Sequence, residues 1–184
     1  MKILAILPAF DDLSLRTTQR KGASLIEKTL ELDKFDLKMI DILAGDGRIS
    51  VVALAKRIGL SKSPTQARLR RLEAAGVILG YRALYDPILL GRDHVAFVEV
   101  KLTDTREAAL AAFNKAVAGV PEVEQCHLIA GSFDYLLKVR TDGMTGYRAV
   151  LAEKISTLPH VAHTSTYVAM QAVKEDGMVS GTGP

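Results

Sequence analysis

The side chains best suited to chemistry lie on a short segment, residues 62–71. At about 100° per helical residue, one face collects residues at the i, i+3, i+4, i+7 spacing, namely Ser63, Gln66, Ala67 and Arg70. Gln and Arg can make paired hydrogen bonds to base edges, whereas Lys and Arg on the flanks neutralise phosphates. The segment therefore predicts a DNA-recognition helix. Its candidate contacts are Lys62, Ser63, Thr65, Gln66, Arg68, Arg70 and Arg71.

One member of this set has a second interpretation. Thr65 shares the opposite face with Leu69 and Leu72, which we expect to pack on the preceding helices. A solvated basic face is the alternative for the whole segment, but the regional charge favours DNA. Residues 33–82 hold ten Lys and Arg against five Asp and Glu, whereas residues 93–175 hold eight against ten. The first region is therefore the candidate for a polyanionic partner.

Two helical patterns precede the segment and would position it. Asp33 is a capping residue, Asp36 follows near the positive helix end, and Gly45 ends the first pattern, whose expected buried stripe is Leu37, Ile40 and Leu43. Ser50 caps the second, which Gly59 ends. Its stripe is Val51, Leu54, Ala55 and Ile58.

A Gly-Leu-Ser turn then leads into the third helix. Ser61 or Ser63 caps this helix, Pro64 is tolerated in its first turn, and the helix extends to about Ala75. Residues 77–82 predict a strand that serves as a wing or a connector. Arg82, at its end, either contacts a phosphate or is simply exposed.

The second half alternates between strand and helix patterns. Strands are expected over 94–102, 122–130, 133–140 and 160–173, with Gly131 and Ser132 forming a tight hairpin. A capping-box-like pair, Asp104 and Glu107, starts one helix, and a second helix carries Tyr147 and Leu151 on its apolar face. This βαββαβ order predicts a ferredoxin-like α+β domain with both helices on one sheet face. The other face is left to pair with a second copy, so we expect a homodimer.

Other classes of function find little support in the residue pattern. Cys126 and His127 are neighbours on an expected strand and point to opposite faces, so they make a poor metal or catalytic site. The sequence has no Gly-rich phosphate loop and no G-x-S-x-G motif, and we expect no cofactor and no catalysis. It has no apolar run of the roughly 18 to 20 residues that a membrane span needs. A single cysteine fits a reducing cytoplasm.

These patterns divide the chain into five parts. Residues 1–31 form an extension that we expect to be poorly ordered, because residues 16–21 are polar and the segment has no long apolar periodicity. Asp11 and Asp12 argue against a signal peptide. Residues 32–82 form the helix-turn-helix domain, 83–92 a linker marked by Asp86 and Pro87, 93–175 the α/β domain and 176–184 a tail.

Six motifs together resemble the Lrp/AsnC family of transcription regulators. In chain order they are LDKFDLKMIDIL, DGRIS, LAKRIGLS, RLRRLEAAGVILGY, QCHLIAGSFDYLLKVR and LPHVAHTSTYVAM. The last two are close to the leucine-responsive branch, and the variant also resembles regulators that activate a proline dehydrogenase gene. The resemblance implies a winged helix-turn-helix joined to a ligand-sensing domain, often called RAM, and assembly as dimers and commonly as octamers of four dimers.

The resemblance also implies an amino-acid effector site between such sensing domains. Carried over by position, the candidate residues are Leu128, Gly131, Ser132, Asp134, Met144, Tyr167 and Val168. Position 132 departs from the acidic residue that is commoner in this hairpin, which leaves the effector open between amino acids such as leucine and proline. Without the resemblance, Gly131 is equally a turn glycine and Asp134 a strand-start acid.

Four functional hypotheses follow from these patterns. The leading one is a DNA-binding regulator of amino-acid metabolism that responds to an effector. A DNA-binding architectural protein without a ligand is the second, and a metabolic enzyme built on the α/β domain is the third. The fourth is a purely structural oligomer, in which the basic helix face is incidental. Steeply salt-dependent DNA binding would separate the leading hypothesis from the fourth.

Overall fold

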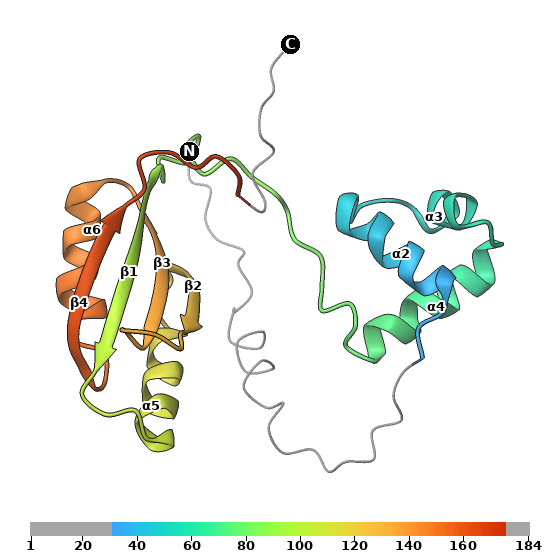
Figure 1. Ribbon diagram of the computed structural model, residues 1–184. Coiled ribbons are helices and arrows are strands. Elements are labelled where there is room, and N and C mark those ends of the chain that lie inside the picture. Colours follow the sequence, from blue (N-terminus) through green and yellow to red (C-terminus); the bar gives the residue numbers. More distant parts are fainter. Residues whose placement is uncertain (1–30, 176–184) are drawn as a thin grey trace, which may run out of the picture. The chain divides into compact units, whose positions relative to one another are not determined.

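The computed structural model describes residues 31–175, which divide into two compact units at the Ala83–Leu84 bond. Figure 1 shows a helical unit and an α/β unit. The extension predicted over 1–31, except for Glu31, and the tail over 176–184 lie outside the described residues.

The helical unit consists of α2 (Lys34–Gly45), α3 (Val51–Ile58) and α4 (Lys62–Ala74). The predicted caps of α2 and α3 are confirmed. Asp33 accepts hydrogen bonds from the backbone N–H groups of Phe35 and Asp36, at 2.8 and 3.0 Å, and Ser50 accepts one from Ala53 at 3.2 Å. These side chains satisfy backbone donors that a first helical turn leaves unpaired.

The core of this unit differs from the prediction on α2. Met39, Ile42, Leu54, Ile58 and Leu72 are buried together, so the stripe expected on α3 is confirmed. On α2, however, the predicted face is rotated: Leu37 is 56% exposed, whereas Asp36 is fully buried. An acidic residue takes a core-facing position because two arginines of α4 lie opposite it.

The strand predicted over 77–82 is not found. The backbone N–H groups of Val77 and Ile78 donate to the carbonyl of Leu72, at 2.9 and 3.2 Å, and thus continue the end of α4. A strand needs a second strand to pair with, and residues 77–82 pair with no strand within residues 31–175.

The α/β unit confirms the predicted βαββαβ order. Its elements are β1 (His94–Leu102), α5 (Glu107–Val117), β2 (Val123–Leu128), β3 (Tyr135–Thr141), α6 (Met144–Val150), a π-helical turn η1 (Leu151–Ile155) and β4 (Val161–Val168). The capping box predicted from Asp104 and Glu107 at the start of α5 is not found. Arg106 occupies the N-cap position, and Asp104 accepts hydrogen bonds from the backbone and the guanidinium of Arg106. The last strand ends at Val168 rather than at Val173.

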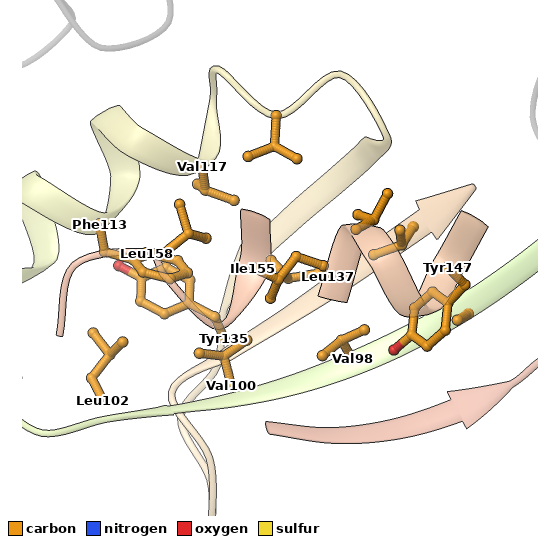
Figure 2. Close-up of a cluster of buried hydrophobic side chains, with 14 residues drawn as sticks. Val98, Val100, Leu102, Phe113, Val117, Tyr135, Leu137, Tyr147, Ile155 and Leu158 are labelled. Atoms are coloured by element: carbon orange, nitrogen blue, oxygen red, sulfur yellow. The ribbon is translucent and has the colours of Figure 1, made fainter. Parts of the chain in front are cut away.

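The four strands form one antiparallel sheet in the order β2-β3-β1-β4, and α5 and α6 cover one of its faces (Figure 1). Figure 2 shows the core between the two layers, where Val98, Val100 and Leu137 of the sheet meet Phe113 and Ile155. Their side chains are fully buried. Burial of this apolar surface is the main force that holds the helices on the sheet.

The opposite face of the sheet, which we expect to pair with a second copy, carries charged as well as apolar side chains. Phe97 lies beside Lys138 on β3 and Tyr167 on β4, and Tyr167 donates a hydrogen bond to Glu99. Lys138 forms an ion pair with Glu124 at 3.0 Å. This face is therefore an apolar patch set among charges rather than a uniformly apolar surface.

Candidate DNA and effector sites

The turn between α3 and α4 fixes the direction of the recognition helix. Gly59 ends α3 with a φ of +83°, a left-handed conformation that glycine adopts without strain. The Leu60 backbone N–H donates to the Ala55 carbonyl at 3.0 Å, and the Leu60 side chain packs against the core of the unit. Because Leu60 is anchored on the core, α4 starts at a defined point beside α3.

The outward face of α4 matches the predicted stripe at most positions. Lys62, Ser63, Ala67 and Arg70 are exposed, and Gln66 is half-buried. Thr65 is a correction, because its side chain is fully buried and its hydroxyl donates to the Ser61 carbonyl at 2.8 Å. The Thr65 side chain therefore belongs to the packing face of α4 and not to its exposed face.

Arg68 and Arg71 have partners that the sequence did not indicate. Arg68 Nη1 lies 2.9 Å from Asp36 Oδ1 and 2.6 Å from Asp33 Oδ2, and Arg71 forms an ion pair with Asp36. Burial by itself would raise the pKa of Asp36, but hydrogen bonds from the Asp33 backbone and from both guanidinium groups hold it below its usual value. Asp36 is therefore a charged carboxylate inside the helical unit.

The first group of predicted effector residues lies at the β2–β3 hairpin. Leu128 is 60% exposed, and Gly131 and Ser132 are exposed in a loop that is longer than the tight turn we expected. Asp134 is different: its side chain is only 12% exposed, accepts a hydrogen bond from the Leu102 N–H at 2.7 Å and pairs with Lys101 at 3.2 Å. Its carboxylate thus fastens the hairpin to the end of β1.

The second group lies at the other end of the sheet. Tyr135, next to the hairpin, pairs with Val100 of β1, whereas Val168 pairs with Ala96, four residues away along the same strand. Met144 begins α6 beyond the Thr141 end of β3. Within one chain the structure does not bring Met144, Tyr167 and Val168 together with the hairpin, although all three are about half exposed.

A hollow of about 440 Å³ beside α6 contains none of the predicted residues. Its walls are Arg92, Pro121, Glu122, Arg140, Thr141, Asp142, Gly146 and Val150. Arg140 is almost fully buried here, paired with Glu124 at 2.6 Å and with Glu175 at 2.7 Å. These ion pairs tie the segment after β4 to the sheet, so the arginine has a structural role.

The remaining chemistry-bearing side chains do not gather. Among residues 31–175, no group of three His, Cys, Asp or Glu side chains could hold a metal ion. Burial raises the pKa of the Cys126 thiol to about 11, which leaves it protonated and unreactive at neutral pH. No helix in the described part is long and apolar enough to span a bilayer.

Comparison with known proteins matches both units. Residues 32–78 match the family model described as "Winged helix-turn-helix DNA-binding", and residues 95–179 match "Lrp/AsnC ligand binding domain". A proline dehydrogenase transcriptional activator of Rhizobium radiobacter is 61% identical over 151 residues, covering 82% of this chain and 97% of that protein. The leucine-responsive regulatory protein of Escherichia coli K12 is 45% identical over 145 residues, covering 79% and 88%.

Solved structures agree with these relatives. A transcriptional regulator of Neisseria meningitidis in complex with L-Met superposes with a TM-score of 0.73 at 30% identity, covering 79% of this chain and 94% of that one. The leucine response regulatory protein of Mycobacterium tuberculosis superposes with a TM-score of 0.70 at 32% identity, covering 79% of this chain and 97% of that one. With a helix-turn-helix that presents an exposed basic face and a βαββαβ sensing domain, this chain belongs to the Lrp/AsnC family of DNA-binding transcription regulators.

Proposed function

We propose that this regulator activates transcription of a proline dehydrogenase gene in response to proline. The observation that carries the proposal is the 61% identity to the proline dehydrogenase transcriptional activator of Rhizobium radiobacter. A second activator of that name, from Rhodobacter capsulatus, is 52% identical, and both values exceed the 45% found for leucine-responsive proteins. For a bacterial chain, the place of action would be the cytoplasm, where the DNA lies.

DNA recognition is assigned to the exposed face of α4, laid in the major groove. Gln66 and Arg70 are the proposed contacts to base edges, because these side chains can pair two hydrogen bonds with one base. Lys62 and Ser63, at the start of α4, are the proposed phosphate contacts. Their exposure at the beginning of the helix supports this assignment.

The effector site is assigned to an interface between two copies of the α/β unit. Leu128, Gly131 and Ser132 would come from the hairpin of one copy, and Met144, Tyr167 and Val168 from the far end of the sheet of another. Two observations support a shared site: the groups lie at opposite ends of one sheet, and each exposes apolar side chains. Asp134 would hold the hairpin in shape, since its carboxylate already has two partners.

Such an interface requires self-association. A dimer that buries the patch around Phe97, and an octamer of four such dimers, would bring hairpins and sheet ends of different copies together. The backbone N–H groups of the hairpin suit the carboxylate of an amino acid, and the exposed apolar residues suit its side chain. One methylene discriminates by only about 1 to 3 kcal/mol, so related amino acids would compete.

The test combines DNA binding with calorimetry on the full chain. Fluorescence anisotropy would measure binding to the promoter fragment upstream of a proline dehydrogenase gene, with and without proline, leucine or alanine. We expect proline to change the promoter affinity most. Leu128→Ala and Met144→Ala should each abolish the heat of proline binding measured by calorimetry. Both variants should still bind the promoter fragment in the absence of effector. Val52→Ala, which trims a side chain that is 61% exposed on α3, is the matched control.

Each other result points elsewhere. A larger response to leucine would reassign the effector. Promoter binding with no response to any amino acid would favour an architectural DNA-binding protein. Proline binding that both variants retain would place the pocket outside the hairpin and the sheet end.

A further inference from the structure

Two acidic residues at the start of α2, Asp33 and Asp36, face the recognition helix. Asp36 is fully buried, on the same face of α2 as Met39 and Ile42, and Asp33 is half exposed at the N-cap. We call these two residues the acid pair. A carboxylate next to a DNA-binding helix repels the negatively charged phosphates of DNA. What these two carboxylates bind therefore matters for DNA binding.

The acid pair binds both arginines on one flank of α4. Arg68 contacts both carboxylates, at 2.6 Å for Asp33 and 2.9 Å for Asp36, and its guanidinium carbon lies 5.5 Å from the centre of the Phe35 ring. Arg71 pairs with the other oxygen of Asp36. The two guanidinium groups are therefore drawn toward α2.

These arginines are not free to exchange partners at low cost. A phosphate that captured Arg68 or Arg71 would cost the Asp36 carboxylate one of its three partners, which are the two guanidinium groups and the Asp33 backbone N–H. Two acids also cancel the charge of two bases on this flank. Lys62 and Arg70, which make no ion pair with the described residues, keep their charge for DNA.

We infer that Asp33 and Asp36 limit the affinity of α4 for DNA of any sequence, because they withhold Arg68 and Arg71 from the DNA phosphates. Phosphate contacts carry no sequence information and supply most of the affinity for non-specific DNA. The absence of two phosphate contacts weakens binding to operator and non-specific DNA alike and leaves the base contacts of Gln66 and Arg70 untouched. The acid pair thus lowers the sequence-independent part of the DNA affinity and its salt dependence. This inference rests on DNA binding through α4.

The experiment compares four variants of the full chain: Asp33→Asn, Asp36→Asn, Arg71→Ala and the control Asp41→Asn. Asp41 is exposed on the same helix and makes no ion pair within residues 31–175, so its substitution changes the net charge equally without releasing an arginine. Asn caps helices as well as Asp does, so Asp33→Asn keeps the cap of α2. Thermal melts identify the temperature at which every variant is folded.

Binding to the promoter fragment and to a scrambled duplex of equal length is measured from 50 to 200 mM salt. Each released arginine should steepen the slope of log K against log salt by about 0.9, an extra loss of about 3.5-fold over this range. Asp36→Asn should tighten binding to both duplexes alike at 50 mM salt, and Asp33→Asn should tighten it less, because Asp36 still holds Arg68 in that variant. Asp41→Asn and Arg71→Ala should keep the wild-type slope.

The inference is overturned if Asp36→Asn and Asp33→Asn give the slope of Asp41→Asn. It is also overturned if Arg71→Ala flattens the slope by about 0.9, since Arg71 would then already be on a phosphate. Should Asp36→Asn fail to fold, Asp33→Asn and Arg71→Ala decide. Failure of DNA binding itself looks different, because wild type would then bind neither duplex.

Discussion

Neighbouring side chains on α4 have different tasks although their types are alike. Arg70 is exposed on the outward face, whereas Arg68 and Arg71 are held by carboxylates of α2. Thr65 is buried and makes a hydrogen bond within the helical unit. A basic helix is therefore not a set of equivalent DNA contacts, and each side chain has to be tested separately.

Substitutions on the exposed face should separate base recognition from charge. Gln66→Ala and Arg70→Ala are each expected to lower operator affinity by about 1 to 3 kcal/mol and to relax base preference. Lys62→Ala should weaken all sequences alike and flatten the salt slope by about one unit. Titration against operator variants and at several salt concentrations measures both effects. Wild-type affinity in the first two variants would remove this face from the interface.

The ends of the helices are set by local backbone chemistry. Gly59 ends α3 at a φ of +83°, and Gly45 ends α2 without a positive φ. A methyl group added at either position would meet no atom within 4 Å. Conformation rather than space therefore determines how each position tolerates a side chain.

This difference can be measured by replacing each glycine with alanine. Gly59→Ala should destabilise the helical unit by about 1 to 2 kcal/mol, because an L-residue pays that much in the left-handed region. Gly45→Ala should be neutral or stabilise by up to about 1 kcal/mol, because alanine favours the helix. Urea unfolding followed by circular dichroism gives both values. Equal effects of the two changes would mean that the turn after α3 tolerates a side chain.

Several large apolar side chains of the α/β unit are exposed. In the α/β unit, Phe97, Tyr167 and Val168 are 37%, 55% and 45% exposed, and Leu89, just before β1, is 84% exposed. Such surfaces on a single chain commonly mark contacts with another protein. A sheet whose open face combines this apolar patch with charges suits a two-fold contact between identical copies.

Self-association through the open sheet face can be tested with one charge. The full chain should sediment as a dimer or larger at micromolar concentration. Phe97→Asp should weaken the association at least about a hundredfold, because an unpaired charge buried at the contact costs about 3 kcal/mol. Val52→Asp, an equally charged change at an exposed position on α3, is the control. An unchanged mass for Phe97→Asp would place the contact elsewhere.

Features that depend on local periodicity or on backbone chemistry could be predicted from the residues alone. The caps Asp33 and Ser50, the stripe of α3, the glycine after it and the βαββαβ order all follow from neighbours a few positions apart. The outward face of α4 is predictable for the same reason, since 3.6 residues per turn place Ser63, Gln66 and Arg70 together.

The remaining features depend on residues that are distant in the chain. Asp36 is buried because it pairs with Arg68 and Arg71. These arginines lie 32 and 35 positions further along the chain, so no local pattern shows the pairing. The hairpin and Val168 lie at opposite ends of the sheet because the register of β3 and β4 on β1 places them there. The type of each element and the face that it buries follow from short-range forces. The ion-pair partners of a charged side chain, and the residues that lie together at a site, are set by how the elements pack in three dimensions.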